Sequence, residues 1–439
     1  MNQIFPPPNF IRTRSALEGI ELYMPAPEKH EPVVVFNCTQ CGGQAAYDIK
    51  EADLTCIYCE SKHSVPHLVV GTKADKFEFT IKTLNRSERG WGESRQEINC
   101  QNCGSHISVP PNELTHTCVF CGSNKVIQRE APQEVLRPRF LVPFQLEATA
   151  CQGIFDKWLG NHWLTPKSLQ QLANLREFTG VYLPFWTFDT RTGADWKAEV
   201  GHAETQDYRE NGEWKTRTVI KWRKESGHVR ESFTNILISG TTQVRASLLG
   251  EIQDYDLSQL VRYDARLLAG LQAQAYEVPI TEAWQKAREQ MREQTLRSGH
   301  RQPSTSRVRN FSMTVRFADE SWRYILLPAY IATYSYYDKP YQIAINGQRG
   351  TIAGPRPVDW RKLFLIVAAF FGSSVLALVV AANLTGQLAN ILFGLGLILL
   401  ISAMLVTVVL FFQAWQLANP EGMSKFKQDI KSTMERKVR

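Results

Sequence analysis

Two long uncharged stretches lie near the C-terminus of the 439-residue chain. Residues 363–382 and 391–412 contain no charged side chain, and only a short polar segment, residues 383–390, separates them. An apolar helix needs about 20 residues to cross a bilayer, and both stretches reach that length. The pattern therefore predicts a hairpin of two transmembrane helices, at residues 361–383 and 388–413. Buried helices of a large soluble core are the alternative interpretation.

Basic residues flank the predicted hairpin on both sides, whereas the segment inside it carries no charge. Arg356, Arg361 and Lys362 precede the first stretch, and residues 420–439 hold a further basic group. Lysine and arginine stay on the cytoplasmic side of a membrane, so both chain ends are predicted to be cytoplasmic. The first ten residues, MNQIFPPPNF, lack the apolar core of a signal peptide. The C-terminal hairpin is therefore expected to direct membrane insertion.

The last twenty residues have the pattern of a basic amphipathic helix. Met423, Phe426, Ile430 and Met434 recur at spacings of three and four, with lysines and arginines between them. Such a helix would lie on anionic lipid and bury its apolar stripe. The alternative is a stop-transfer tail that only fixes the orientation of the hairpin.

Residues 131–356 predict an α+β soluble domain rich in antiparallel sheet. Helices are expected at residues 148–159, 263–276 and 280–296, and strands at residues 139–146, 181–188, 307–317, 322–336 and 341–345. Leu183-Pro184-Phe185 is echoed by Leu327-Pro328-Ala329, which indicates a repeated β unit.

The dipeptide Asn211-Gly212 predicts the turn of a β-hairpin between residues 195–208 and 214–222. On the second arm, residues Trp214, Thr216, Thr218, Ile220 and Trp222 alternate with basic residues. One face is therefore expected to pack against the protein and the other to present positive charge. The basic face is the best candidate for contact with an anionic surface; a solvated face is the plainer interpretation.

Eight of the nine cysteines form four Cys-x-x-Cys pairs in the first third of the chain. The pairs are Cys38/Cys41, Cys56/Cys59, Cys100/Cys103 and Cys118/Cys121. Each set of four has the spacing C-x2-C-x14-C-x2-C, and the second set repeats the first at an offset of 62 residues. Four thiolates at this spacing can close one tetrahedral Zn²⁺ site, which leaves no open position for chemistry. The sequence therefore predicts two zinc ribbons, at residues 34–70 and 96–130, with two structural zinc ions.

Disulfides or a Cys-x-x-Cys redox centre are the alternative for these pairs. Gly42, Gly104 and Gly122 directly follow the second cysteine of their pairs, where a metal-binding turn favours glycine, but Glu60 follows Cys59. Residues 1–33 are predicted to form a flexible, proline-rich leader, for which a docking peptide is the alternative. Residues 71–95 read as a linker with an alternating, strand-like run at residues 76–81.

The charge distribution and the absence of common catalytic motifs reduce the number of functional classes that fit the sequence. The net charge of +7 is modest, and most of the excess lies after residue 210, outside both cysteine units. A ribbon that binds nucleic acid should present a basic face, and neither unit does. No phosphate loop, dinucleotide fingerprint, H-E-x-x-H or G-x-S-x-G motif is present.

The remaining candidate ligands and nucleophiles are single residues. His63, His67, His106 and His116 lie beside the ribbons and could replace a thiolate, but each ribbon already has four sulfurs, so these histidines are expected at the surface. Cys151 is expected on a buried helix face with Phe155 and Leu159 rather than as a catalytic nucleophile.

Several segments together resemble a bacterial family of membrane proteins with double zinc ribbons of the TFIIB or primosomal-helicase type. They are CTQC…CIYC, CQNC…CVFC, LPFWTFDT, YDARLLAGLQAQAYEV, YQIAINGQRG and the C-terminal hairpin. The resemblance implies a location in the bacterial inner membrane. It also implies partners of the phage-shock-protein-A-like (PspA-like) and flotillin-like (SPFH) classes, in envelope stress. Members carry a helicase label, but this chain lacks the phosphate loop that a helicase needs.

Three functional classes follow. A membrane-anchored adaptor, whose ribbons recruit cytoplasmic proteins, agrees with closed metal sites and near-neutral ribbons. A membrane-tethered nucleic-acid-binding protein is the alternative, for which ribbon folds give precedent but the charge distribution does not. An enzyme that uses the middle domain has no positive support, so no catalytic residue is assigned.

Overall fold

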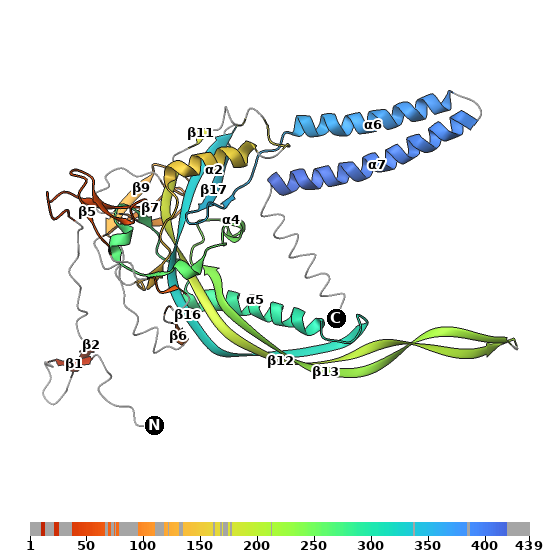
Figure 1. Cartoon of the computed structure of the whole chain (residues 1–439), viewed down its shortest axis with the longest axis horizontal. Helices are drawn as coiled ribbons and strands as arrows, with labels where there is room; N and C mark the ends of the chain where they lie inside the picture. The colour runs from red at the N-terminus through yellow and green to blue at the C-terminus, as the bar shows by residue number, and fades with distance from the viewer. Residues whose placement is uncertain are drawn as a thin grey trace.

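The structure of the chain, a computed structural model, is shown in Figure 1. It describes residues 10–13, 22–25, 37–65, 69–71, 74, 76–78, 95–109, 118–121, 123–130, 135–160, 163–166, 169, 174–175, 178–211, 213–336, 339–383 and 387–418. A large sheet-rich domain carries two clusters of four cysteines on the side remote from two apolar C-terminal helices. The predicted tail at residues 420–439 and most of the predicted leader and linker lie outside the described residues.

Short strands dominate the N-terminal third, and long strands dominate the middle of the chain. The strands are β1 (Phe10–Thr13), β2 (Leu22–Pro25), β3 (Ala45–Asp48), β4 (Asp53–Cys56), β5 (Lys62–His63), β6 (Phe77–Glu78), β7 (Gln96–Cys100), β8 (His106–Val109), β9 (Val126–Glu130), β10 (Phe140–Leu141), β11 (Asn174–Leu175), β12 (Thr179–Glu210), β13 (Glu213–Ser239), β14 (Val261–Arg262), β15 (Gln272–Ala273), β16 (Val308–Tyr336), β17 (Lys339–Asn346) and β18 (Ile352–Ala353). The helices are α2 (Ala148–Gly160), α4 (Ala246–Glu251), α5 (Ile280–His300), α6 (Trp360–Ala382) and α7 (Gln387–Ala418), with short 3₁₀ turns at Leu257–Gln259 and Ala265–Leu268.

The antiparallel pairing of β12 with β16 forms the centre of the domain. Leu183 pairs with Leu327, so the two similar segments that the sequence suggested as a repeat lie against each other. Strand β12 also pairs with β13, and β16 pairs with β17, which extends one sheet over most of the domain. The pairing of β12 with β13 and its pairing with β16 both shift register near Asp189, where the hydrogen-bond ladder is irregular.

The central strands are buried on both faces. Tyr182, Trp186 and Phe188 of β12 belong to one hydrophobic cluster, and Val181, Leu183 and Phe185 belong to another. Because successive strand residues point to opposite faces, the two clusters lie on opposite sides of the sheet. Such strands read as continuous apolar runs, as residues 181–188 do.

Helices α2 and α5 cover the first of these faces. Cys151, Phe155 and Leu159 are buried at four-residue spacing on α2, as the sequence predicted. Helix α5 contributes Trp284 and Met291 to the same cluster. The Trp186 indole N–H donates to the carbonyl oxygen of Val278 just before α5, at 2.9 Å, which satisfies a polar group that the core would otherwise leave unpaired.

Strands β12 and β13 continue far beyond the core as a projecting hairpin (Figure 1). The prediction of a turn at Asn211 is confirmed, since Glu210 pairs with Glu213. Strand β16 begins at Val308 opposite Val200, so residues 201–222, here called the arm, form a ribbon of only two strands. The expectation that the apolar face of the arm packs against the protein is wrong: Trp214 is 74% exposed and Ile220 is 44% exposed. No third strand of the described chain reaches that far.

Two further predictions need correction. The predicted helix at residues 263–276 is instead a 3₁₀ turn followed by β15. The Asp264 side chain accepts from the Arg266 amide and caps that short turn, and Gly270, at φ +75°, ends any helical continuation. The predicted strand at residues 139–146 shrinks to β10, and those at residues 307–317 and 322–336 merge into β16.

Within the predicted leader, β1 and β2 form a separate two-stranded antiparallel sheet. In the predicted linker, only Phe77 and Glu78 are described as a strand, which pairs with β16 at Trp322 and Ser321. Residues 79–94 lie outside the described residues.

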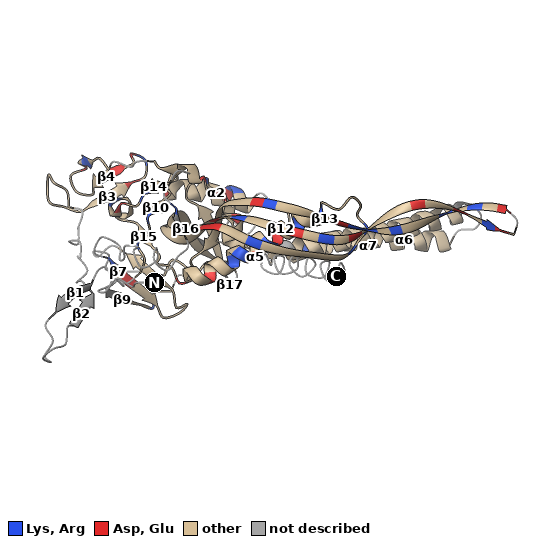
Figure 2. Ribbon diagram, turned by 90° about the horizontal axis from the view of Figure 1, so that it is seen from below, with Lys and Arg blue, Asp and Glu red and all other residues tan. Residues whose placement is uncertain are grey.

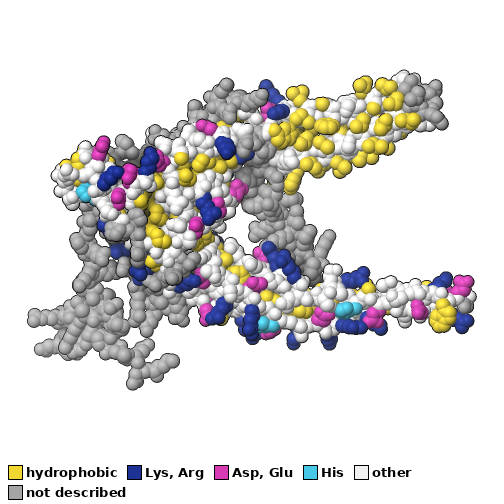
Figure 3. Space-filling model, viewed as in Figure 1, with side chains coloured by type: hydrophobic (Ala, Val, Ile, Leu, Met, Phe, Trp, Pro, Cys, Tyr) yellow, Lys and Arg dark blue, Asp and Glu magenta, His cyan; other side chains and the backbone are white. Residues whose placement is uncertain are grey.

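Helices α6 and α7 form an antiparallel pair whose apolar side chains face outward (Figure 3). Both are long and apolar enough to cross a membrane, and only 11% of the apolar window of each is buried. A core helix of a soluble protein would be mostly buried, so this exposure favours lipid contact. The pair is joined to the domain where Leu363 and Ala414 pack on Leu164, and the Asp359 amide donates to the Leu164 carbonyl oxygen at 2.8 Å.

Substitutions of Trp186 in the core and Trp214 on the arm should have very different effects on the free energy of unfolding. Trp186→Ala should lower the free energy of unfolding by about 3–5 kcal/mol, because it removes a fully buried ring. Trp214→Ala should change it by less than about 0.5 kcal/mol, because that ring is exposed. Denaturant titration of the purified chain in detergent measures both values. Equal losses for the two variants would contradict an exposed arm.

Candidate metal centres

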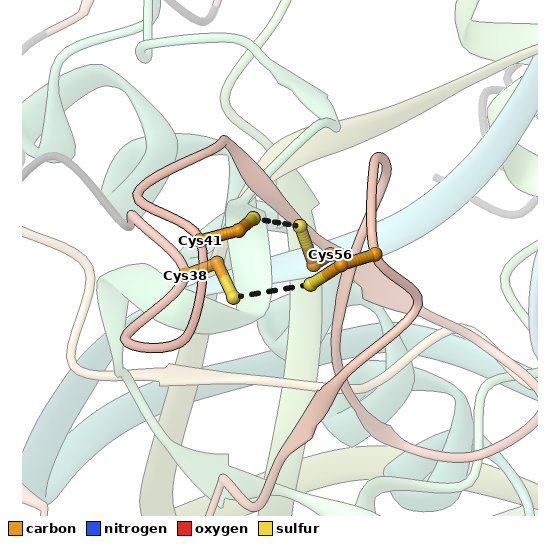
Figure 4. A group of neighbouring side chains, drawn as sticks. Cys38, Cys41 and Cys56 are labelled. Carbon is orange, nitrogen blue, oxygen red and sulfur yellow. Dashed lines mark hydrogen bonds between the residues drawn. The ribbon is translucent and has the colours of Figure 1, made fainter.

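The first cysteine unit, residues 37–65, brings four sulfurs together at the end of a small sheet. Strands β3, β4 and β5 form this three-stranded antiparallel sheet, and Cys56 ends β4. The Sγ atoms of Cys38 and Cys59 lie 3.6 Å apart, and those of Cys41 and Cys56 lie 3.4 Å apart. Figure 4 shows the sulfurs of the two turns directed toward one another. All four lie within 4.8 Å of each other.

The turns of the first unit place backbone amides on sulfur. The Gln40 amide donates to Cys38 Sγ at 3.3 Å, the Gly43 amide donates to Cys41 Sγ at 3.4 Å, and the Tyr58 amide donates to Cys56 Sγ at 3.5 Å. Amides in these positions stabilise thiolates and hold them toward a common centre. The Gly43 amide lowers the pKa of Cys41, but the neighbouring sulfurs of Cys59 and Cys56 outweigh it and raise that pKa to about 12, so a cation is needed to keep this sulfur charged.

Left-handed backbone follows the cysteine pairs, as the glycine pattern indicated. Gly42 and Gly104 have φ of +75° and +73°. Glu60 also adopts φ +58°, although it has a side chain. That conformation costs roughly 1 kcal/mol for a residue other than glycine, so the closure of the turn around the sulfurs outweighs it. Gly122 lies outside the described residues.

The second cysteine unit, residues 95–130, repeats this geometry within the main sheet. Cys100 and Cys121 have Sγ atoms 3.6 Å apart, and Cys103 and Cys118 likewise lie 3.6 Å apart. Strand β7 lies between β8 and β9, and β8 pairs with β15 through Ser108 and Ala273. The second unit is therefore part of the large sheet, whereas the first has its own.

Buried Arg95, which sequence reasoning missed, joins the second unit to the domain. Its guanidinium donates to the carbonyl oxygens of Ser108 and Leu271 at 3.0 and 2.8 Å, and to the Ser108 hydroxyl at 2.8 Å. Hydrogen bonds from a buried charge to carbonyl oxygens are stronger than neutral ones. No sequence pattern marked this contact, because the two residues that accept from Arg95, Ser108 and Leu271, are more than 160 residues apart in the chain.

Both clusters fit a tetrahedral zinc ion. A Zn–S bond of about 2.3 Å in a tetrahedron places neighbouring sulfurs about 3.8 Å apart, close to the separations in both units. In each unit the four donors are thiolate sulfurs, and their number completes the coordination shell. The two tetra-cysteine clusters can therefore bind metal ions such as zinc.

Two serines, which the sequence patterns did not identify, lie against the sulfurs. The Ser61 hydroxyl is 2.9 Å from Cys38 Sγ and makes the largest contribution among several hydrogen bonds, one of them from His63, that together lower the pKa of Cys38 to about 5. In the second unit, burial raises the pKa of Cys118, even though the Ser105 hydroxyl lies 3.0 Å from its sulfur. A deprotonated Cys118 therefore needs a cation beside it, which Zn²⁺ would supply.

Among the remaining candidates that the structure describes, His63 is half-buried and contacts the first centre, contrary to the expected surface position, whereas His106 and Cys151 belong to neither centre. His63 Nε2 lies 3.4 Å from Cys38 Sγ, next to the four-sulfur shell, and His106 Nδ1 lies 3.5 Å from a Glu97 carboxylate oxygen. His67 and His116 lie outside the described residues. Burial raises the pKa of Cys151 to about 12, so its thiol is protonated and unreactive at neutral pH.

The chain was compared with known proteins. It is similar to the uncharacterized protein YdjG of Bacillus subtilis (strain 168), at 22% identity over 360 residues, which cover 81% of this chain and 99% of that protein. No family model matches the chain, and no solved structure matches it.

Elemental analysis of the purified chain should give two zinc ions. Cys38→Ser or Cys118→Ser should reduce the content to one, because three thiolates no longer close the shell. Cys151→Ala should leave two and serves as the control, since Cys151 lies outside both clusters. One ion or none in the unaltered chain would contradict the two-site prediction.

Proposed function

We propose that the protein is a membrane-anchored adaptor with two structural zinc ribbons, which recruits other proteins to the cytoplasmic face of a bacterial inner membrane. The observation that carries the proposal is the pair of four-sulfur clusters. A zinc ion held by four cysteines has no open position for substrate or water, so each metal serves folding and surface shape. The proposal therefore assigns no catalytic role to either centre.

The apolar pair α6–α7 supports the anchoring part of the proposal. Its exposed surface is apolar, and the cysteine units lie on the remote side of the domain (Figures 1 and 3). Insertion of this pair would leave both units in the aqueous phase. A reducing cytoplasm would keep their eight thiols available for metal.

The arm constrains how the domain would sit at a membrane. It extends in the same direction as α6 and α7 in both ribbon views (Figures 1 and 2), and charged residues recur along it, coloured blue and red in Figure 2. Charged side chains are costly in hydrocarbon, so the arm cannot enter the bilayer beside the helices. Membrane insertion would thus require the arm to bend away beyond His202, past the last contacts that residues 304–307 make with it, so that it could lie along the head groups. Trp214 and Lys215 at its tip are residue types that favour that interface.

Paired charges on the first cysteine unit favour a protein partner over nucleic acid. Lys62 pairs with Glu51 at 2.9 Å, and Lys50 pairs with Glu147 at 3.0 Å. Lysines with carboxylate partners contribute little to phosphate binding, which depends on unneutralised positive charge. Partners of the PspA-like and flotillin-like (SPFH) classes, implied by the family resemblance, are the candidates that we propose. Nucleic-acid binding is the second candidate, since ribbon folds give precedent for it.

Residues 420–439 add a proposed contact with anionic lipid through their basic, amphipathic pattern. This segment lies outside the described residues, and the proposal rests on its sequence alone.

Reporter fusions test the orientation. Reporters before Met1 and after Arg439 should both indicate the cytoplasm, and one inserted between Gly386 and Gln387 should indicate the opposite side. The reason is the basic residues that flank the helices and are absent between them. A signal from outside the cytoplasm at either terminus would overturn the orientation.

Purification of the tagged full chain from membranes tests the adaptor function. Specific proteins should copurify at a constant ratio to the chain. The control is a tagged chain shortened to residues 340–439. The two preparations should contain equal amounts of nucleic acid. The shortened chain keeps the helices but lacks both cysteine units. Enrichment of nuclease-sensitive material with the full chain alone, without a protein partner, would favour nucleic-acid binding.

A further inference from the structure

The two cysteine units are duplicates, but the same turn meets different surroundings in each. At the offset of 62 residues, Ile57 and Tyr58 between the third and fourth cysteines correspond to Val119 and Phe120. Each pair consists of a branched aliphatic residue followed by an aromatic one.

In the second unit the turn is docked on the central sheet. Val119 and Phe120 are only 8% and 5% exposed, and they belong to the same hydrophobic cluster as Ile331 and Ala344 of the central sheet. The carbonyl oxygen of Phe120 accepts a hydrogen bond from Gln342 Nε2 at 3.0 Å. The turn therefore packs against an apolar sheet surface that has a side-chain amide at its border.

In the first unit the same turn is open to solvent. Ile57 is 58% exposed and Tyr58 is 73% exposed. The rest of that unit packs on the domain, since Tyr47 and Leu54 are buried in the core cluster. The unit is thus fixed in place by its other residues, while Ile57 and Tyr58 remain open to solvent. Adjacent exposed isoleucine and tyrosine are typical of a protein contact.

We propose that Ile57 and Tyr58 form the docking surface for a partner protein of different sequence. The chemistry of the partner follows from the second unit: an apolar sheet face with a side-chain amide donor at its border. This inference deepens the proposed adaptor function and rests on it.

A second copy of the chain and a lipid surface fit the position less well. The matching surface in any other copy is already covered by its own Phe120, which Gln342 holds in place. Lipid is remote, because the first unit lies at the end of the domain opposite to α6 and α7 in both ribbon views (Figures 1 and 2). A soluble or peripheral protein is the occupant that can reach this turn.

Site-specific photocrosslinking in the native host tests the proposal. A photoreactive amino acid at position 58 of the full chain should give a discrete adduct with another protein. The same amino acid at position 214, where exposure is matched at 74% against 73%, should not give that adduct. An adduct with a copy of this chain, an adduct with lipid alone, or the same adduct from both positions would overturn the inference.

Binding of the crosslinked protein, identified by mass spectrometry and purified, completes the test. Tyr58→Ser and Ile57→Ser should each weaken its affinity for the full chain by about 10-fold or more, as loss of a central apolar contact does. Tyr208→Ser on the arm should leave the affinity unchanged, and all variants should retain two zinc ions. If the protein binds but neither substitution weakens it, the docking surface is wrong while the adaptor function stands. If no protein copurifies with the full chain at all, the adaptor function itself fails.

Discussion

The pairing of β12 with β16 is the constraint on which the other parts of the molecule depend. The two strands align Leu183 with Leu327 and bury side chains on both faces. Strands buried on both sides cannot slip by one residue, because every side chain would then move to the opposite face. Helices α2 and α5, both cysteine units and the long hairpin all take their positions from this register.

Apolar residues of the two cysteine units pack on opposite faces of that sheet, although strands β7 to β9 of the second unit also belong to it. Tyr47 of the first unit joins the cluster that contains Trp186, and Phe120 of the second joins the cluster that contains Phe185. A unit of this size has too little apolar surface to fold independently, so packing on the domain contributes to its stability, and a bound metal ion would add to it. One unit buries its distal turn in the process, and the other leaves the same turn accessible.

The projecting elements show what happens where the register ends. Beyond Val200, β12 loses β16 as a neighbour, and a two-stranded ribbon alone has little stability in water. Cross-strand charge pairs such as Lys215 with Glu210 at 2.9 Å help to hold the arm, each with a small contribution at the surface. Helices α6 and α7 differ, because a helix satisfies its own backbone hydrogen bonds and needs only its partner and an apolar surrounding.

The sequence by itself determined the features that depend on neighbouring residues. The Cys-x-x-Cys spacing identified both four-sulfur clusters, the apolar runs identified α6 and α7, and four-residue periodicity identified α2. Only the tertiary structure decided which surfaces are covered. Alternation along Trp214, Ile220 and Trp222 predicted a packed face, yet exposure followed from the end of β16, a strand about 100 residues away in the chain. Phe120 and Tyr58 have equivalent local sequence, and their opposite burial depends on where residues 331–344 of the distant sheet lie. Patterns within a few residues specify an element and its ligands, whereas burial depends on long-range contacts that no local pattern contains.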